Sequence, residues 1–179
     1  GSYKGRCTAP LLVDCKTKTI VSNESKDIVR MLATAKFSQD SSTLYPDELS
    51  TKIDETNEWV YNDINNGVYQ CGFSTTQEAY DRASVNVRRG LERCNEILSK
   101  QTFLCSDEKV TEADLMLLPT VLRFDGVYAP LFKAGGTHQR ISQYPHLQRW
   151  LKDSMWTLSG VKETIDIQDA CGSYYKQLF

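Results

Sequence analysis

The residues best suited to chemistry lie in the stretch Asn65-Asn66-Gly67-Val68-Tyr69-Gln70-Cys71-Gly72-Phe73, which interrupts two helical patterns. Apolar residues recur at helical spacing before it, and Asn66-Gly67 supplies the left-handed residues that commonly end a helix. Tyr69 then stands on a short loop that is anchored at both ends. A phenol held in this way can give a proton to a substrate or take one from it. The stretch therefore predicts proton transfer by Tyr69.

A packing role is the alternative for the same residue. By residue type alone, a tyrosine between two helices is more often a core residue with a hydrogen-bonded hydroxyl. Both interpretations need a second helix after the loop, and Thr75 followed by Glu78 has the pattern of a capping box that opens one. This helix is expected to run to about Lys100. Its apolar stripe is most simply core: Ala79, Ala83, Val87, Leu91, Cys94 and Leu98.

Composition excludes several classes of function. The chain has 179 residues and a formal net charge of -2, with a pI of about 5.7, so no basic surface for nucleic acid is expected. The longest apolar run, Leu115 to Leu122, contains Pro119 and is far shorter than the roughly 20 residues that cross a bilayer. Without a signal-peptide pattern, we expect a soluble cytoplasmic protein with no membrane partner. The alternative is a chloroplast or another organelle, if a transit peptide has been removed.

The cysteines and histidines predict neither a disulfide framework nor a metal site. The six cysteines are scattered along the chain without a Cys-x-x-Cys pair, which favours free thiols in a reducing compartment. His138 and His146 stand on either side of Pro145, and a solvated or capping role is expected for each.

The first forty residues have a different pattern of predicted secondary structure from the rest of the chain. Leu11-Leu12-Val13 and Thr19-Ile20-Val21 are short β-prone runs on either side of a polar segment, which predicts a hairpin. Ile28, Met31 and Leu32 then repeat at helical spacing. A hairpin followed by a helix is half of a thioredoxin-like fold.

From about residue 41 the pattern is helical. Ser38 to Thr43 has the composition of a linker. Thr111-Glu112-Ala113-Asp114 is a capping box, in which Thr111 and Asp114 satisfy exposed backbone donors. It precedes Leu115-Met116-Leu117-Leu118, a run that is apolar on every side and therefore belongs in the centre of a bundle. We assign the capping box to folding and not to chemistry.

Several segments, in order along nearly the whole chain, resemble the glutathionyl-hydroquinone reductases, the Xi class of glutathione transferases. They are Asn23-Glu24-Ser25, Ile53-Asp54-Glu55 through Trp59, Asn65 to Phe73, Thr111 to Asp114, and Arg123-Phe124-Asp125-Gly126-Val127-Tyr128. The resemblance implies a mainly α fold. Residues 41–179 would form the all-α glutathione-transferase C-terminal bundle, and residues 1–40 a partial thioredoxin-like ββα segment. The segment Lys133 to Arg140 departs from the family pattern.

The family reaction is the reduction of a glutathionyl-hydroquinone by glutathione through a cysteine-glutathione mixed disulfide. The resemblance implies that Tyr69 protonates the leaving carbon, while Tyr128 and Tyr174 donate hydrogen bonds that stabilise the thiolate. Tyr174 is the better match of two neighbours, with Tyr175 as the alternative.

Five residues of the first segment are implied to bind glutathione, the cosubstrate. Pro10 would be a cis proline after Ala9, whose backbone pairs with the cysteinyl part, although sequence alone favours a trans bond. Glu24 and Ser25, at a helix start, would hold the γ-glutamyl end. As plain structure both are ordinary N-terminal helix residues. Arg6 would lie near the glycyl carboxylate, and a surface arginine is the alternative.

The family nucleophile is a cysteine in a Cys-Pro motif at a helix N-terminus, and this sequence contains no Cys-Pro pair. We expect the chain to be part of a longer protein that carries the cysteine, and therefore to be inactive alone. The alternative is a natural variant without the nucleophile. The competing function is a non-catalytic glutathione-transferase-like binding or scaffold module. As partners we expect glutathione, glutathionyl-hydroquinone and a second copy in a homodimer.

Overall fold

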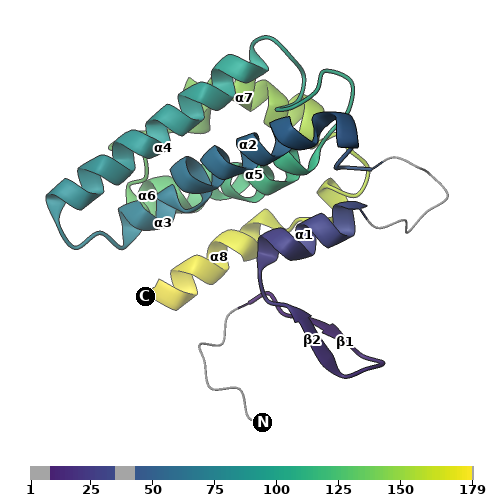
Figure 1. Ribbon diagram of the computed structural model, residues 1–179. Coiled ribbons are helices and arrows are strands. Elements are labelled where there is room, and N and C mark those ends of the chain that lie inside the picture. The colour runs from purple at the N-terminus through teal and green to yellow at the C-terminus, as the bar shows by residue number, and fades with distance from the viewer. Residues whose placement is uncertain (1–8, 35–42, 179) are drawn as a thin grey trace. The chain divides into compact units, whose positions relative to one another are not determined.

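Residue contacts divide the chain into two units, Gly1–Asp47 and Glu48–Phe179, and each is described here by itself. The computed structural model describes residues 9–34 and 43–178 (Figure 1). The boundary predicted after residue 40, and most of the predicted linker Ser38 to Thr43, lie outside the described residues.

The first unit begins with the predicted hairpin, which the structure confirms. Strands β1 (Leu12–Asp14) and β2 (Thr19–Ser22) pair antiparallel. The Asp14 carboxylate shapes the turn between them, because its Oδ1 accepts hydrogen bonds from the N–H groups of Lys16 at 2.8 Å and Thr17 at 3.1 Å. These bonds lower the pKa of Asp14.

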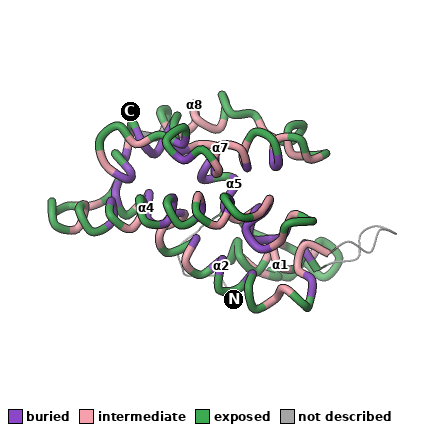
Figure 2. Tube along the Cα trace, turned by 90° about the horizontal axis from the view of Figure 1, so that it is seen from above, coloured by how far each residue is buried: buried purple, intermediate pink, exposed green. Residues whose placement is uncertain are grey.

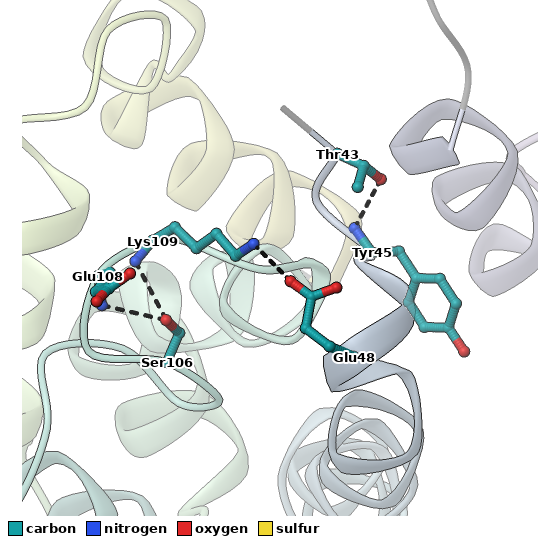
Figure 3. Close-up of polar contacts among 6 residues, drawn as sticks. All are labelled: Thr43, Tyr45, Glu48, Ser106, Glu108 and Lys109. Carbon is teal, nitrogen blue, oxygen red and sulfur yellow. Dashed lines mark hydrogen bonds and ion pairs between the residues drawn. The ribbon is translucent and has the colours of Figure 1, made fainter. Parts of the chain in front are cut away.

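Helix α1 (Ser25–Thr34) follows the hairpin, also as predicted. Thr43 and Tyr45 contact this helix within the same unit. The Thr43 hydroxyl donates to the Ala33 carbonyl at 3.0 Å. It also accepts from the Tyr45 N–H at 3.1 Å (Figure 3). The Arg30 guanidinium lies 3.5 Å from the centre of the Tyr45 ring, at a distance typical of a cation–π contact.

Large apolar side chains of this unit are exposed on the hairpin and on α1. A two-stranded hairpin with one helix is too small to enclose them. The exposed residues are Leu11, Val13, Ile20, Val21, Met31 and Leu32.

The second unit is helical, which confirms the predicted fold class. Its α-helices are α2 (Ser50–Trp59), α3 (Gly67–Gly72), α4 (Gln77–Leu98), α5 (Glu112–Arg123), α6 (Ala129–Phe132), α7 (Pro145–Arg149) and α8 (Ile167–Leu178). Wider π-helical turns occupy Val60–Asn65, Phe124–Tyr128 and Trp150–Met155. Short 3-10 turns occupy Asp47–Leu49, Ile141–Gln143 and Lys162–Thr164.

Helix α4 buries the predicted stripe. Val87, Leu91 and Cys94 are fully enclosed, whereas Ala79, near the start of the helix, stays partly exposed. Figure 2 shows buried and exposed residues interspersed along α4, as expected of a helix that buries one face.

The start of α4 differs from the prediction by one residue. Thr76, not Thr75, is the N-cap, and its hydroxyl accepts from the Ala79 N–H at 3.2 Å. Glu78 is therefore one place too early to complete a capping box with Thr76. It instead pairs with Arg82 one turn further along the helix.

Helix α5 confirms the predicted capping box and adds contacts that the sequence did not indicate. The Asp114 carboxylate accepts from the Thr111 N–H at 3.0 Å and the Thr111 hydroxyl at 2.9 Å. It also accepts from the Leu104 N–H and the Trp150 Nε1–H, each at 2.9 Å. Asp114 is fully buried, and burial raises its pKa against the effect of these four donors. One carboxylate thus joins α5, the loop before it and Trp150.

The loop before α5 is also closed by contacts of its own. The Ser106 hydroxyl accepts from the N–H groups of Glu108 and Lys109, and the Lys109 ammonium lies 3.0 Å from a Glu48 carboxylate oxygen (Figure 3). This ion pair is exposed, so it contributes little to the free energy of folding.

The run Glu112–Phe132 is long and apolar enough to span a membrane by length and composition. Half of its most apolar window is buried inside this unit, as in the core helix of a globular protein. It also carries Arg123 and Asp125 near its centre.

We predict that Asp114→Ala lowers the free energy of unfolding by about 3 to 5 kcal/mol, because it leaves buried N–H donors of Thr111, Leu104 and Trp150 without an acceptor. Denaturant unfolding of the chain, followed by far-UV circular dichroism, measures the change. Asp153→Ala is the control, since Asp153 is exposed. Equal stability of the two variants would contradict the prediction.

Candidate active site

Tyr69 lies on a helix and not on the predicted loop. Asn66 has φ -86°, so the expected left-handed end of the helix is wrong. The chain instead widens into the π turn Val60–Asn65, in which the Asn66 N–H donates to the Tyr61 carbonyl at 2.8 Å, and continues directly into α3. The π turn changes the direction of the side chains without ending the helix.

Gly67 serves packing where a left-handed conformation was expected. A Cβ added there would lie 3.0 Å from a Val87 methyl group on α4, so glycine allows α3 to approach α4 closely. Asn65, two residues earlier, ties the start of α3 to helix α5. Its amide nitrogen donates to the Met116 carbonyl at 2.9 Å, and its amide oxygen accepts from the Thr120 hydroxyl at 2.7 Å, both on α5.

The structure brings together the three tyrosines that the sequence singled out. Their hydroxyl oxygens form a triangle in which Tyr69 and Tyr174 share a short hydrogen bond. The Tyr128 oxygen lies 3.0 Å from that of Tyr174 and 3.3 Å from that of Tyr69. Tyr128 is almost fully buried, while Tyr69 and Tyr174 are partly exposed. The phenols therefore meet at a place that a ligand can reach.

Three different elements deliver these phenols. Tyr69 comes from α3, Tyr128 from the end of the π turn Phe124–Tyr128, and Tyr174 from α8. Gly126 lets α8 approach, because a Cβ there would lie 2.9 Å from the Cys171 sulfur on α8. The structure also separates Tyr174 from its neighbour. The Tyr175 hydroxyl donates to the Gly126 carbonyl at 3.1 Å, outside the cluster.

Arg123 is the member of the site that sequence reasoning missed. Its Nη1 lies 3.3 Å from the Tyr174 oxygen and 3.4 Å from the Tyr128 oxygen. The sequence offered one signal, since Arg123 is a cation directly after an apolar helical run and five residues before Tyr128. Its half-burial is seen only in the structure. Burial lowers the pKa of Arg123, but the phenols raise it more, so the guanidinium remains charged.

Aromatic rings line the tyrosine cluster. The Phe132 ring centre lies 5.8 Å from that of Tyr69 and 5.9 Å from that of Tyr128. Phe73 stacks nearly parallel to Tyr69, with ring centres 6.4 Å apart, and is 65% exposed. An aromatic ring that is anchored on one face and exposed on the other can stack with a planar aromatic ligand.

The three phenols differ in acidity. Burial raises the pKa of Tyr69 and, more strongly, that of Tyr128. For Tyr174, burial also raises the pKa, but hydrogen bonds from Tyr128 and Tyr69 and the charge of Arg123 lower it further, so that its net pKa is below the usual value. Tyr174 is thus the phenol of the cluster that ionises most readily.

A cleft of about 390 Å³ adjoins Arg123 within this unit. Leu118, Pro119 and Leu122 of α5 form one side, and the segment from Thr164 to Ala170 forms the other. Its walls combine these apolar side chains with one cation, Arg123, and two carboxylates, Asp166 and Asp169.

The residues predicted to bind glutathione belong to the first unit. The Ala9-Pro10 peptide bond is cis, as the resemblance implies. Ser25 is the first residue of α1, and the Glu24 carboxylate accepts from the Lys26 N–H at 3.4 Å. Arg6 lies outside the described residues. Their roles toward glutathione remain predictions.

Three buried thiols of the second unit are not activated. Burial raises the pKa of Cys71, Cys94 and Cys105, which keeps these thiols protonated. Cys15 is exposed in the hairpin turn. Among the described residues, no group of three or more histidine, cysteine, aspartate or glutamate side chains could hold a metal ion.

Comparison with known proteins agrees with this geometry. Residues 77–153 match the family model of the glutathione S-transferase C-terminal domain. Over 97% of its length the chain is 43% identical to the glutathionyl-hydroquinone reductase YqjG of Escherichia coli. It is 40% identical, again over 97% of its length, to the glutathionyl-hydroquinone reductase PcpF of Sphingobium chlorophenolicum. The chain spans about half the length of these relatives, 52% and 55% respectively.

Solved structures give the same assignment. The glutathione-bound structure of Escherichia coli YqjG matches 97% of this chain, and 55% of its own, with a TM-score of 0.87 at 43% identity. The Xi glutathione transferase ECM4 of Saccharomyces cerevisiae, in complex with glutathione, matches 94% of this chain and 56% of its own, with a TM-score of 0.86 at 34% identity. The helical unit and its tyrosine cluster therefore define a glutathione-transferase fold. Within that family the chain belongs with the Xi class and the glutathionyl-hydroquinone reductases.

The close contact between Gly126 and α8 gives a prediction about the site. Gly126→Ala forces its new methyl group against the Cys171 sulfur, which we expect to destabilise the chain by about 1 to 3 kcal/mol. Adding Cys171→Ala removes the sulfur and should restore most of the loss. Thermal unfolding measures both.

Gly172→Ala is the matched control, because a Cβ at Gly172 meets nothing within 4 Å and alanine favours the helix. A double variant as unstable as Gly126→Ala alone would show that Cys171 is not the obstacle.

Proposed function

We propose that the chain supplies the proton-donating part of a site that reduces glutathionyl-hydroquinones with glutathione. The convergence of three phenols and one guanidinium carries this proposal, because such a cluster can give up a proton and stabilise the charge that remains. The relatives named as glutathionyl-hydroquinone reductases support the substrate class.

In the proposed reaction, a cysteine thiolate attacks the sulfur that joins glutathione to the hydroquinone ring. The carbon–sulfur bond breaks, and its electron pair stays with the ring carbon. Tyr69 protonates that carbon, which releases the hydroquinone. A second glutathione thiolate then attacks the cysteine-glutathione disulfide, which frees the cysteine and forms glutathione disulfide.

The nucleophile is proposed to come from a segment that precedes residue 1 in the longer protein. Cys71, Cys94 and Cys105 are buried with raised pKa values, and the sequence contains no Cys-Pro pair. A cysteine that is to ionise at neutral pH needs a helix N-terminus or a neighbouring cation to lower its pKa. The chain alone is therefore proposed to be inactive.

Glutathione is the proposed cosubstrate of the first unit. Ala9 and the cis Pro10 offer an extended backbone for pairing with the cysteinyl part, and the start of α1 at Ser25 offers the positive end of a helix to a carboxylate. Glu24 suits the ammonium group of the same end, and Arg6 the glycyl carboxylate. Two solved relatives are titled as holding glutathione.

The homodimer and the cytoplasmic location remain predictions from the sequence.

A chimera tests the function. The N-terminal part of Escherichia coli YqjG that has no counterpart here is joined to this chain, and turnover of a glutathionyl-hydroquinone with excess glutathione is followed by formation of glutathione disulfide. We expect turnover in the chimera and none in the chain alone. Tyr69→Phe should lower kcat of the chimera by about a hundredfold or more, as for loss of a general acid.

Tyr61→Phe and Tyr175→Phe are the controls. Tyr61 is 53% exposed, and Tyr175 lies beside Tyr174 but outside the cluster, so turnover should be close to that of the unchanged chimera. A chimera that folds, binds glutathione and reduces no glutathionyl-hydroquinone would leave the non-catalytic binding module as the better interpretation. Unchanged kcat in Tyr69→Phe would refute its role as the donor.

A further inference from the structure

The Tyr174 oxygen is the point at which the hydrogen bonds of the cluster converge. It has three neighbours: the Tyr69 hydroxyl at short range, the Tyr128 hydroxyl at 3.0 Å and the Arg123 Nη1 at 3.3 Å. The Tyr128 oxygen has the same number of neighbours at longer distances, and that of Tyr69 has only the two phenols. A negative charge on Tyr174 can thus accept three hydrogen bonds at once.

We propose that Arg123 is a positioning residue that makes the three phenols act as one acid, whose negative charge settles on Tyr174 whichever phenol gives up the proton. This proposal rests on the proposed function and adds to it the residue that receives the charge. Arg123 takes no proton step of its own in this proposal and acts through the phenols that it contacts, so it is not itself a catalytic residue.

The charged groups around the cluster support this role for Arg123. On α5, Glu112 and Asp114 stand at the opposite end of the helix, and their carboxylates are bonded to Asn57 and to the donors described above. Asp125 accepts from the Ile141 N–H. Asp166 and Asp169 line the cleft beside Arg123, with the Asp166 carboxylate accepting from the Asp169 N–H.

These neighbours leave Arg123 as the source of positive charge for the cluster. In the part of the chain that the structure describes, no ion pair joins Arg123 to a carboxylate. Helix α3 has no charged side chain, and its titratable residues are Tyr69 and the buried Cys71. On α8, Cys171 and Tyr175 lie on the side of Gly126, and the Tyr175 hydroxyl donates to the Gly126 carbonyl. Half-buried charges interact more strongly than exposed ones, so the guanidinium acts on the phenols with little screening.

In the proposed reaction, each group that gives up a proton receives one in turn. Tyr69 gives its hydroxyl proton to the ring carbon, and the Tyr174 hydroxyl proton moves to Tyr69 along their short hydrogen bond. The Tyr174 phenolate that results is held by Tyr128, Tyr69 and Arg123. Tyr174 is partly exposed, so water returns the proton before the next turnover. Burial raises the pKa of Tyr69 and Tyr128, which disfavours charge on either of them.

The test is a near-ultraviolet titration of tyrosinate in the 179-residue chain itself, which needs neither glutathione nor turnover. The first phenol to ionise as pH rises should disappear in Tyr174→Phe. In Arg123→Gln its midpoint should rise by on the order of one pH unit or more, because the nearby cation is lost. Arg123→Lys keeps the charge and should show a smaller rise.

Tyr175→Phe is the control, since it removes one phenol of the same helix outside the cluster and should leave the first ionisation in place. Far-UV circular dichroism checks that each variant is folded, and Arg123→Lys carries the test if Arg123→Gln does not fold. The proposal is overturned if the first ionisation survives in Tyr174→Phe, or if its midpoint is unchanged in both folded Arg123 variants.

Activity supplies a second, independent readout. A donor must be protonated, so kcat of the chimera falls as pH rises through the pKa of the cluster. Loss of Arg123 raises that pKa, and Arg123→Gln should therefore shift the alkaline limb of the kcat profile to higher pH. An inactive chimera with the expected titration would refute the proposed function alone. An active chimera with an unshifted titration and an unshifted limb would refute the role of Arg123 alone.

Discussion

The helical unit depends on one buried carboxylate. Asp114 has no exposed surface, and a charge or a polar group in that position is tolerated only when its hydrogen bonds are made. Its four donors come from the start of α5, from Leu104 in the loop before it, and from Trp150. At the same end, Glu112 accepts from the Asn57 amide of α2 at 2.9 Å. These contacts fix one end of the central helix, and a rigid helix fixed at one end also determines where its other end lies.

The other end of α5 carries the chemistry. Arg123 is its last residue, and the π turn that follows places Tyr128 beside it. Asn65 ties the start of α3 to the middle of α5 through Met116 and Thr120, so Tyr69 is positioned relative to the same helix. The positions of the phenols thus depend on α5, through Asn65 for Tyr69, through the π turn for Tyr128, and through the packing of α8 against Gly126 for Tyr174. This agrees with the general rule that reacting groups need support from residues that do not themselves react.

Sequence reasoning succeeded where the signal was local or where a whole motif was matched. The Thr111–Asp114 capping box, the hairpin of the first unit and the stripe of α4 are short-range patterns, and the structure has them. The resemblance selected Tyr69, Tyr128 and Tyr174, which the structure brings together. Sequence reasoning did not find Arg123 because its role depends on contact with Tyr174, which is distant in the chain. The helix that carries Tyr69 was missed because Asn66-Gly67 was taken to end the preceding helix. In the structure Gly67 serves close packing, and the chain continues through a π turn. The choice between Thr75 and Thr76 depended on one-residue precision, which patterns do not supply.

The place of the π turn between α2 and α3 decides how the site responds to a change that substitutions do not probe, the loss of one residue. Each such turn contains one residue more than a regular helix of the same span. Deleting a single residue from Val60–Asn65 would let α2 and α3 join as one regular helix with the later residues still in phase. The same deletion within the regular helix α2 would instead rotate everything after it by about 100°. Tyr69 would then face away from Arg123, while Gly67 would no longer meet Val87. In this segment the length of the chain, as much as the identity of its residues, specifies the site.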